Sequence, residues 1–527
     1  MSVDHSPPRA THSRTYLAVL ALLALFTAWS PIHAQRAELE RRIRRDTLPN
    51  GLEIIVVENH GVPLATVEAN VRNGSFTQSP TYEGLSHLYE HMFFKANLSY
   101  PEPDAFVARA SELGAIFNAS TQEERVNYYL TVPSDSTVPA IALLATALRT
   151  PLFLKDELER ERSVVIGEYD RIESDPYYAL NTATGKALWG SAWSRKNPLG
   201  ERDVILKTTP EQMRTIQRKY YVPNNTALIV TGDVDANKVF AAARRYLGDW
   251  QRAPDPFKSD PIPPVPPLTE NKGVVVEEPV NTVIAVIQWD GPGAHADPAA
   301  TYAADVFSDV LNQPGSRFQR ALVDNGPWQS ILVNYYTLNQ IGPITISGEV
   351  APDKLRAALQ ALDHELREVV KPGYITKEAV DGVKRTRMVG SIESLERPSG
   401  FAHQLGFWWA VTGMDYFLGY VDTMANQSPD DLRSYANRYI VGKPHVTGVV
   451  LSPETRRTLK LTESELAEIF AGNFFGLDAE IAAVTVPRER KCPRLGMRSW
   501  CGRRLGGHSG NRDRRKHCKR KHFANHV

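Results

Sequence analysis

The stretch Gly84-Leu-Ser-His87-Leu-Tyr-Glu90-His91-Met-Phe-Phe-Lys95 places two imidazoles and one carboxylate within five residues of an apolar run. If the stretch is helical, His87 and His91 lie at positions i and i+4 and project from one face. Two neutral imidazoles at that separation can hold one Zn²⁺ and leave room for a third protein ligand and a water molecule. Glu90 lies on the same side, where a carboxylate can accept a proton from metal-bound water as a general base.

The same residues allow a second interpretation, in which a plain amphipathic helix carries two solvated histidines. The order His-x-x-Glu-His reverses the commoner order of zinc-dependent hydrolases, and only three of its five positions are fixed. Residues elsewhere in the chain are therefore needed to distinguish a metal site from a surface helix with two solvated histidines.

The C-terminal end of the 527-residue chain differs in composition from the body. Residues 488–527 contain fourteen Lys/Arg and two Asp/Glu, and they include all three cysteines, Cys492, Cys501 and Cys518. The body of the chain, residues 1–487, contains 47 Lys/Arg and 58 Asp/Glu. It is therefore acidic, and nothing in it indicates nucleic-acid binding. A body without cysteine has no disulfide and no thiol nucleophile. We expect residues 487–527 to be a disordered basic tail without a catalytic role.

The N-terminus has the pattern of an export signal. Arg9 and Arg14 precede an uncharged apolar core at 17–29, and Ala34 provides a small residue before a cleavage point. An apolar core of this length is short for a membrane span, which favours a cleaved signal peptide at 1–34 over a signal anchor. We therefore expect an exported protein with no stable membrane span after cleavage, and a bacterial periplasm fits a body without disulfides.

Hydrophobic patterning between the two ends repeats once. Seven prolines between Pro254 and Pro267 predict a semi-rigid, extended linker at 253–271. On either side of it, 218–230 and 437–451 have similar sequences at an offset of about 220 residues. Two lobes of similar plan follow from this repeat, the first at 46–252 and the second at 272–475, where the His-x-x-Glu-His motif has no counterpart. The predicted strands are 52–57, 65–71, 114–121, 127–132, 226–231, 274–276 and 282–289, and the predicted helices include 103–113, 139–148, 155–172 and 299–311.

A third metal ligand has candidates in the segment 157–168. On a helix, Glu161 and Glu168 share one face with Val164 and Val165, where an unpaired carboxylate is costly. A metal ion would explain carboxylates at such a place. From spacing alone, a pair of edge carboxylates bridged to arginines explains them at least as well.

These motifs together resemble the pitrilysin/insulinase family of zinc metallopeptidases, which includes mitochondrial processing peptidase. In that family the last zinc ligand is a Glu well downstream of the second His, and here Glu168 follows His91 by 77 residues. The further matches run in family order from about residue 46 to 475: Leu48-Pro-Asn-Gly51, Gly114-x-x-x-Asn118-Ala119-x-Thr121, Tyr221-x-Pro-Asn-Asn225 and Thr231-Gly-Asp233.

The resemblance implies an α+β fold of two homologous lobes like those of mitochondrial processing peptidase, joined by the Pro-rich linker. It also implies one Zn²⁺ per chain, bound by His87, His91 and Glu168. Glu90 would be the general base. Glu161 would not bind the metal itself and would orient one of the zinc-binding side chains.

The resemblance further implies a peptide substrate. The strand around Asn118 and Ala119 would take an extended peptide by strand addition, which provides affinity through backbone hydrogen bonds. The expected function is therefore zinc-dependent endopeptidase hydrolysis of extended peptides.

One departure from the family lies in the second lobe. Active members carry an Arg and a Tyr seven residues apart, which bind substrate and stabilise the transition state. Aligned on Gly326, these two positions hold Leu322 and Gln329, and the nearby Arg320 is more typical of a solvated helix charge. We therefore expect a homologous subunit to supply the Arg/Tyr pair in a heterodimer.

Two other functions stay open at this point. The first is a catalytically silent structural subunit of a heteromeric assembly, although a scaffold has no need of Glu90 beside both histidines. The second is a zinc-independent peptide-binding module or chaperone. Metal content together with turnover of an unstructured peptide distinguishes all three.

Overall fold

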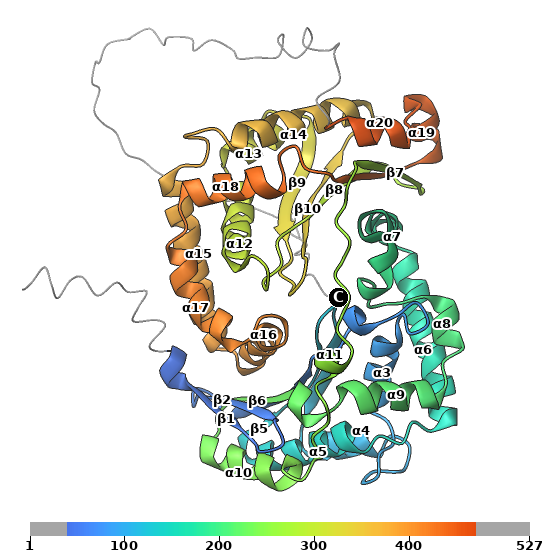
Figure 1. Cartoon of the computed structure of the whole chain (residues 1–527), viewed down its shortest axis with the longest axis vertical. Helices are drawn as coiled ribbons and strands as arrows, with labels where there is room; N and C mark the ends of the chain where they lie inside the picture. Colours follow the sequence, from blue (N-terminus) through green and yellow to red (C-terminus); the bar gives the residue numbers. More distant parts are fainter. Residues whose placement is uncertain (1–38, 471–527) are drawn as a thin grey trace, which may run out of the picture. The chain divides into compact units, whose positions relative to one another are not determined.

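The computed structural model describes residues 39–470, which are drawn in colour in Figure 1. The predicted signal peptide (1–34) and the predicted basic tail (487–527) lie outside the described residues. Between residues 39 and 470, no helix is both long and apolar enough to span a membrane.

The first lobe is built on a six-stranded sheet with the order β1-β2-β6-β3-β5-β4. Its neighbouring strands are antiparallel except for the parallel pair β2 and β6. Alternate side chains such as Ile54, Val67 and Leu130 point to one face and form the main core of this lobe. The strands are β1 (Ile43–Thr47), β2 (Glu53–Glu58), β3 (Leu64–Val71), β4 (Ile116–Thr121), β5 (Val126–Pro133) and β6 (Thr226–Gly232).

Helices of the first lobe cover that face of the sheet, and Leu88, Leu144 and Val239 pack from three of them into the same core. Helix α9 begins at a capping box, in which Thr209 and Gln212 satisfy the free backbone groups of the first turn. The helices are α3 (Leu85–Phe93), α4 (Ala105–Glu112), α5 (Thr137–Arg149), α6 (Lys155–Glu173), α7 (Pro176–Trp189), α8 (Arg202–Leu206), α9 (Pro210–Tyr220) and α10 (Ala236–Leu247).

The second lobe repeats this plan after a connection that contains the short helix α11 (Pro256–Ser259). Its sheet has the order β7-β11-β8-β10-β9, and its one parallel pair, β7 and β11, corresponds to β2 and β6. The prediction of two homologous α+β lobes is therefore confirmed. The strands are β7 (Lys272–Glu277), β8 (Val283–Asp290), β9 (Trp328–Tyr335), β10 (Pro343–Val350) and β11 (Val446–Leu451).

The helices of the second lobe follow the same order as those of the first. Helix α18, the counterpart of α9, also begins at a capping box, formed by Ser428 and Asp431. The helices are α12 (Pro298–Asn312), α13 (Arg317–Gln319), α14 (Leu355–Val369), α15 (Lys377–Leu395), α16 (Pro398–Val411), α17 (Met414–Ala425), α18 (Pro429–Tyr439), α19 (Pro453–Leu459) and α20 (Glu463–Glu468).

The two lobes exchange one helix each, α7 and its counterpart α16. Helix α16 of the second lobe packs across β3 and β6 of the first, and α7 of the first lobe packs across β7, β11 and β8 of the second. Trp409 of α16 shares a buried cluster with Ile55 and Ile229, whereas Leu180 of α7 packs against Val286. Figure 1 shows α16 above the first sheet and α7 beside β7. Each sheet therefore has its second face covered by the other lobe.

All strands and helices that the patterning predicts are present, with ends that differ by one or two residues. Strands β9, β10 and β11 were not predicted, and neither was β1. Its sequence, Ile43-Arg-Arg-Asp-Thr47, is largely polar and only Ile43 is buried, so an edge strand of this kind lacks the alternation that marks a strand.

Candidate metal centre

Helix α3 carries the His-x-x-Glu-His motif and has two distinct faces. It begins after Gly84, whose φ of 87° lies in the left-handed region that glycine adopts without strain. One face, which includes Leu88 and Met92, is fully buried in the core of the first lobe. The face with His87 and His91 is only half-buried, so both imidazoles are held by the helix and remain accessible.

His87, His91 and Glu168 converge at one point. The Nε2 atoms of both histidines lie 3.6 Å from Oε2 of Glu168, which α6 brings to α3. The candidate ligand atoms all lie within 4.8 Å of one another, and within the described part of the chain no other trio of His, Cys, Asp or Glu meets this criterion. Two imidazole nitrogens and one carboxylate oxygen form the three-ligand donor set of catalytic zinc sites, so these residues fit Zn²⁺.

Glu161 and Lys95 support one of the two histidines. Oε2 of Glu161 lies 3.2 Å from Nδ1 of His91, and Oε1 of Glu161 lies 2.7 Å from Nζ of Lys95. The arginine that spacing alone suggested as a partner of Glu161 is thus replaced by a histidine and a lysine. The role of Lys95 was not predicted from the sequence, although Lys95 is the last residue of the stretch that begins at Gly84.

The other histidine lacks such support. Nδ1 of His87 is buried and has no hydrogen-bond partner. Ligand histidines usually donate their second nitrogen to a carboxylate or carbonyl, which orients the ring. Only His91 therefore has both ring nitrogens engaged.

The charges of the cluster are unequal in the absence of metal. Burial lowers the pKa of His87 to about 4, and the charge of His91 adds to this effect. Burial also lowers the pKa of His91, but hydrogen bonds with Glu161 and Glu168 outweigh it and raise that pKa to about 9. At neutral pH and without metal, His87 is therefore neutral and His91 carries the positive charge of the pair.

Glu90 occupies a different environment from the three converging residues. Oγ1 of Thr121, at the end of β4, donates a hydrogen bond of 2.6 Å to Oε2 of Glu90. Burial raises the pKa of Glu90 to about 7, although the Thr121 bond acts in the opposite direction. A carboxylate with a pKa near neutrality can both accept and return a proton.

Asn118 and Ala119 lie on β4, which is one of the two edge strands of the first sheet. The side chain of Asn118 is exposed, and its Oδ1 accepts a hydrogen bond of 2.9 Å from the backbone N–H of Ala119. Strand β4 pairs with β5 on one side only, so its other side can receive a further strand.

The second lobe does not offer an Arg/Tyr pair at the aligned positions. Leu322 is completely buried in the core of the second lobe, and Gln329 is exposed on β9. Arg317 stacks over the ring of Tyr374 at 4.3 Å and forms an ion pair with Glu368. Arg317 is therefore already engaged within its own lobe.

The cluster of two histidines and one glutamate, on a two-lobed α+β scaffold, agrees with a metallopeptidase, the class that the comparisons with known proteins support. The family model of insulinase (peptidase family M16) matches residues 53–197, and that of the peptidase M16 inactive domain matches residues 207–387. The chain belongs to this family.

Similar proteins include zinc protease PqqE of Helicobacter pylori, which is 25% identical over 447 residues that cover 82% of this chain and 98% of PqqE. The uncharacterised zinc protease YmxG of Bacillus subtilis is 23% identical over 353 residues, which cover 66% of this chain and 83% of YmxG.

Solved structures show the same fold. A protease from Helicobacter pylori superposes with a TM-score of 0.70 at 20% identity, over 78% of this chain and 99% of that protein. The first half of the periplasmic protease PqqL from Escherichia coli has a TM-score of 0.68 at 17% identity and is covered to 98%. Of the whole of PqqL, 52% is covered.

Proposed function

We propose that this chain is a zinc-dependent endopeptidase that hydrolyses extended peptides. The observation that carries the proposal is the convergence of His87, His91 and Glu168 around one point, with Glu90 on the same helix. The names of the relatives, zinc protease in both cases, support the same reaction.

His87, His91 and Glu168 would hold the zinc ion, one per chain. A zinc ion bound there supplies Lewis-acid polarisation of a peptide carbonyl and makes water a better nucleophile. Glu90 accepts the proton of the attacking water and then donates it to the leaving amine, which a pKa near 7 allows in both directions. Glu161 holds the ring of His91 in place through Nδ1.

The peptide would bind along β4. Backbone groups on the open side of this strand, at Asn118 and Ala119, would pair with an extended substrate. Such pairing does not depend on substrate side chains, so we expect a broad preference for unstructured peptides.

The chain would act together with a homologous subunit. Hydrolysis builds negative charge on the former carbonyl oxygen, and one preorganised donor there is worth about 3–4 kcal/mol. Leu322 and Gln329 provide neither an Arg nor a Tyr, so we propose that the partner supplies both. The observation that this chain matches about half of PqqL supports an assembly of two such units.

The test is to measure zinc content and the turnover of an unstructured peptide with the purified chain alone and with any co-encoded homologue that lacks His-x-x-Glu-His. One zinc per chain and turnover that appears with the homologue would support both proposals. Full activity of the isolated monomer would refute the need for a partner. Zinc binding without turnover in either preparation would favour a silent subunit, and peptide binding without zinc would favour the chaperone.

The proposed enzyme would be exported. We propose a signal peptide at 1–34, a peptidase lobe at 46–252, a linker at 253–271, a second lobe at 272–475 and a basic tail at 487–527. PqqL is named a periplasmic protease, which supports the same compartment here. N-terminal sequencing of the mature protein should begin near Gln35, and a membrane-bound protein that keeps residues 1–34 would indicate a signal anchor instead.

A further inference from the structure

Thr121 is the last residue of β4, and its hydroxyl contacts the carboxylate of Glu90 on α3. We propose that Thr121 is the positioning residue of Glu90: it holds one carboxylate oxygen so that the other faces the water that attacks the peptide. This role deepens the proposed function and rests on it. Thr121 is a positioning residue and not a catalytic one, because it acts only through Glu90.

The contact fixes a side chain that is otherwise free to turn. A glutamate on a half-buried helix face has three side-chain torsions, and the helix itself sets only the direction in which the chain leaves the backbone. The hydrogen bond of 2.6 Å from Oγ1 of Thr121 engages Oε2 of Glu90 and assigns Oε1 to proton transfer. A shift of about 1 Å in a reacting group can cost about 10²-fold in rate, so an anchor of this kind matters for turnover.

Thr121 itself is held rigidly. It is 7% exposed, and its backbone pairs with β5. The adjacent Ser120 donates a hydrogen bond of 2.5 Å to Oδ1 of Asn127, and Nδ2 of Asn127 donates one of 2.9 Å to Glu68. Glu68, which is completely buried in β3, also pairs with His403 of α16. This series of polar contacts links the end of β4 to β3, at the centre of the sheet, and to α16 from the second lobe.

The position of Thr121 on β4 joins two parts of the proposed reaction. The same strand would bind the substrate backbone at Asn118 and Ala119, two to three residues before Thr121. The strand that aligns the scissile peptide therefore also aligns the base that serves it. We expect loss of the Thr121 hydroxyl to affect the chemical step and to leave peptide binding unchanged, since the backbone of β4 is not altered.

The competing explanation is that Thr121 merely satisfies a buried carboxylate and so stabilises the fold. The two explanations differ in what a conservative hydroxyl residue restores. Serine keeps the donor and loses only a methyl group, whereas valine keeps the shape and loses the donor. Thr131 offers a matched control, because its hydroxyl bonds to Thr66 at 2.9 Å in the same sheet and does not contact Glu90.

The experiment compares Thr121→Val, Thr121→Ser and Thr131→Val in the full chain, together with the homologous subunit if the wild type requires it. We expect Thr121→Val to lower kcat by about 10–100-fold, the range found when a supporting contact of an active site is lost. Its KM should stay within about twofold of wild type and its zinc content at one per chain. Thr121→Ser and Thr131→Val should keep kcat within about threefold.

Crystal structures of the metal-free wild type, Thr121→Val and Thr121→Ser provide a readout that needs no activity. The carboxylate of Glu90 should leave its wild-type position in the valine variant and keep it in the serine variant. Wild-type kcat in Thr121→Val, equal losses in the valine and serine variants, or an unmoved Glu90 carboxylate would each overturn the proposal. If Glu90→Gln itself keeps full turnover, the proposed function fails, and the crystal structures still decide whether Thr121 positions the side chain.

Discussion

The first lobe brings two histidines and a glutamate together, and the second lobe brings two aspartates and an arginine together at the corresponding place. Asp305 and Asp309 on α12 follow His87 and His91 by 218 residues, and Arg387 on α15 follows its counterpart on α6 by 219. In both lobes, two side chains one helical turn apart meet a third from a neighbouring long helix.

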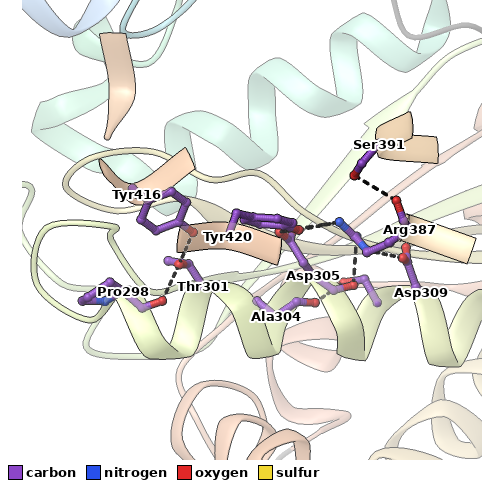
Figure 2. A network of polar contacts seen from close by, with 10 residues as sticks. Pro298, Thr301, Ala304, Asp305, Asp309, Arg387, Ser391, Tyr416 and Tyr420 are labelled. Atoms are coloured by element: carbon purple, nitrogen blue, oxygen red, sulfur yellow. Dashed lines mark hydrogen bonds and ion pairs between the residues drawn. The ribbon is translucent and has the colours of Figure 1, made fainter. Parts of the chain in front are cut away.

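Figure 2 shows how the second lobe arranges its charges. The guanidinium of Arg387 contacts the carboxylate of Asp309, and its Nη1 lies 3.8 Å from Oδ2 of Asp305. The hydroxyl of Tyr420 bonds to both Arg387 and Asp305 at 2.6 Å. Burial raises the pKa of Asp305, so the arginine beside it is what keeps a charged carboxylate there.

The same scaffold brings three side chains together in each lobe. The residue types at these positions decide whether the cation is a side chain of the protein or an external metal ion. The first lobe offers two imidazoles and one carboxylate, a set that suits an external divalent ion. The second lobe carries its own cation in Arg387, which is already paired with both Asp305 and Asp309. This contrast fits the match of 207–387 to an inactive domain.

The largest expected difference between the two lobes comes from replacing Glu90, the proposed general base of the first lobe. We expect Glu90→Gln to reduce peptide turnover by about 10²–10⁴-fold and to keep the zinc, because the proton acceptor is removed while all three ligands remain. Ser308 is the counterpart of Glu90 in the second lobe, so Ser308→Ala should leave turnover unchanged. Peptidase assays with zinc analysis make the measurement, and normal turnover by Glu90→Gln would refute the mechanism.

The second test compares the ligands. His91→Ala should lower zinc affinity by more than about 10²-fold, since even residues that only support a ligand contribute 10–100-fold. Asp309→Ala, the matched change in the second lobe, should keep one zinc per chain. Metal analysis after dialysis distinguishes the two variants. Equal zinc loss in both would mean that the two lobes do not differ in zinc binding.

The third test concerns stability and should affect only the second lobe. Arg387→Leu leaves two carboxylates without their cation, and we expect it to lower the free energy of unfolding by about 3–5 kcal/mol. The exposed neighbour Arg385 is the control, and Arg385→Leu should stay within about 0.5 kcal/mol of wild type. Urea unfolding measures both. Equal stability of the two variants would show that the guanidinium does not replace a metal ion.

The smallest expected effect is the release of a proton when zinc binds. His91 has a pKa of about 9 without metal, and a zinc ligand must be deprotonated, so zinc binding between pH 7 and 8 should release about one proton. Zinc affinity should therefore rise with pH up to about 9. Calorimetry in buffers of different ionisation enthalpy measures the release, and Glu161→Gln should reduce it. Binding without proton release at pH 7.5 would contradict the charge assigned to His91.

Much of this site could be predicted from the sequence, because its central contacts are local. His87, Glu90 and His91 lie within five residues, and helical geometry alone sets two of them side by side. Glu168 was proposed through the family resemblance and its spacing, and it lies in one cluster with His87 and His91. Most strands of the first sheet, and β7 and β8 of the second, were predicted from their apolar residues and the turn residues beside them.

The remaining features depend on how separate elements pack. The contact of Thr121 with Glu90 joins residues 31 positions apart and requires both the register of β4 and its placement beside α3. Likewise, the apolar faces of α7 and α16 indicate that each helix is buried and give no information on which sheet it covers. Sequence patterns of one helix or strand cannot specify such partners.

The exchange of α7 and α16 bears on whether one lobe can fold without the other. One lobe folded alone would leave Ile55, Val57 and Ile229 in contact with water, because the helix that covers them comes from elsewhere. Two identical copies would complete each other by trading that helix, as swapped dimers do. Joining two such copies end to end would give the order of strands that both lobes share. We therefore expect that neither lobe, expressed alone, is a stable monomer.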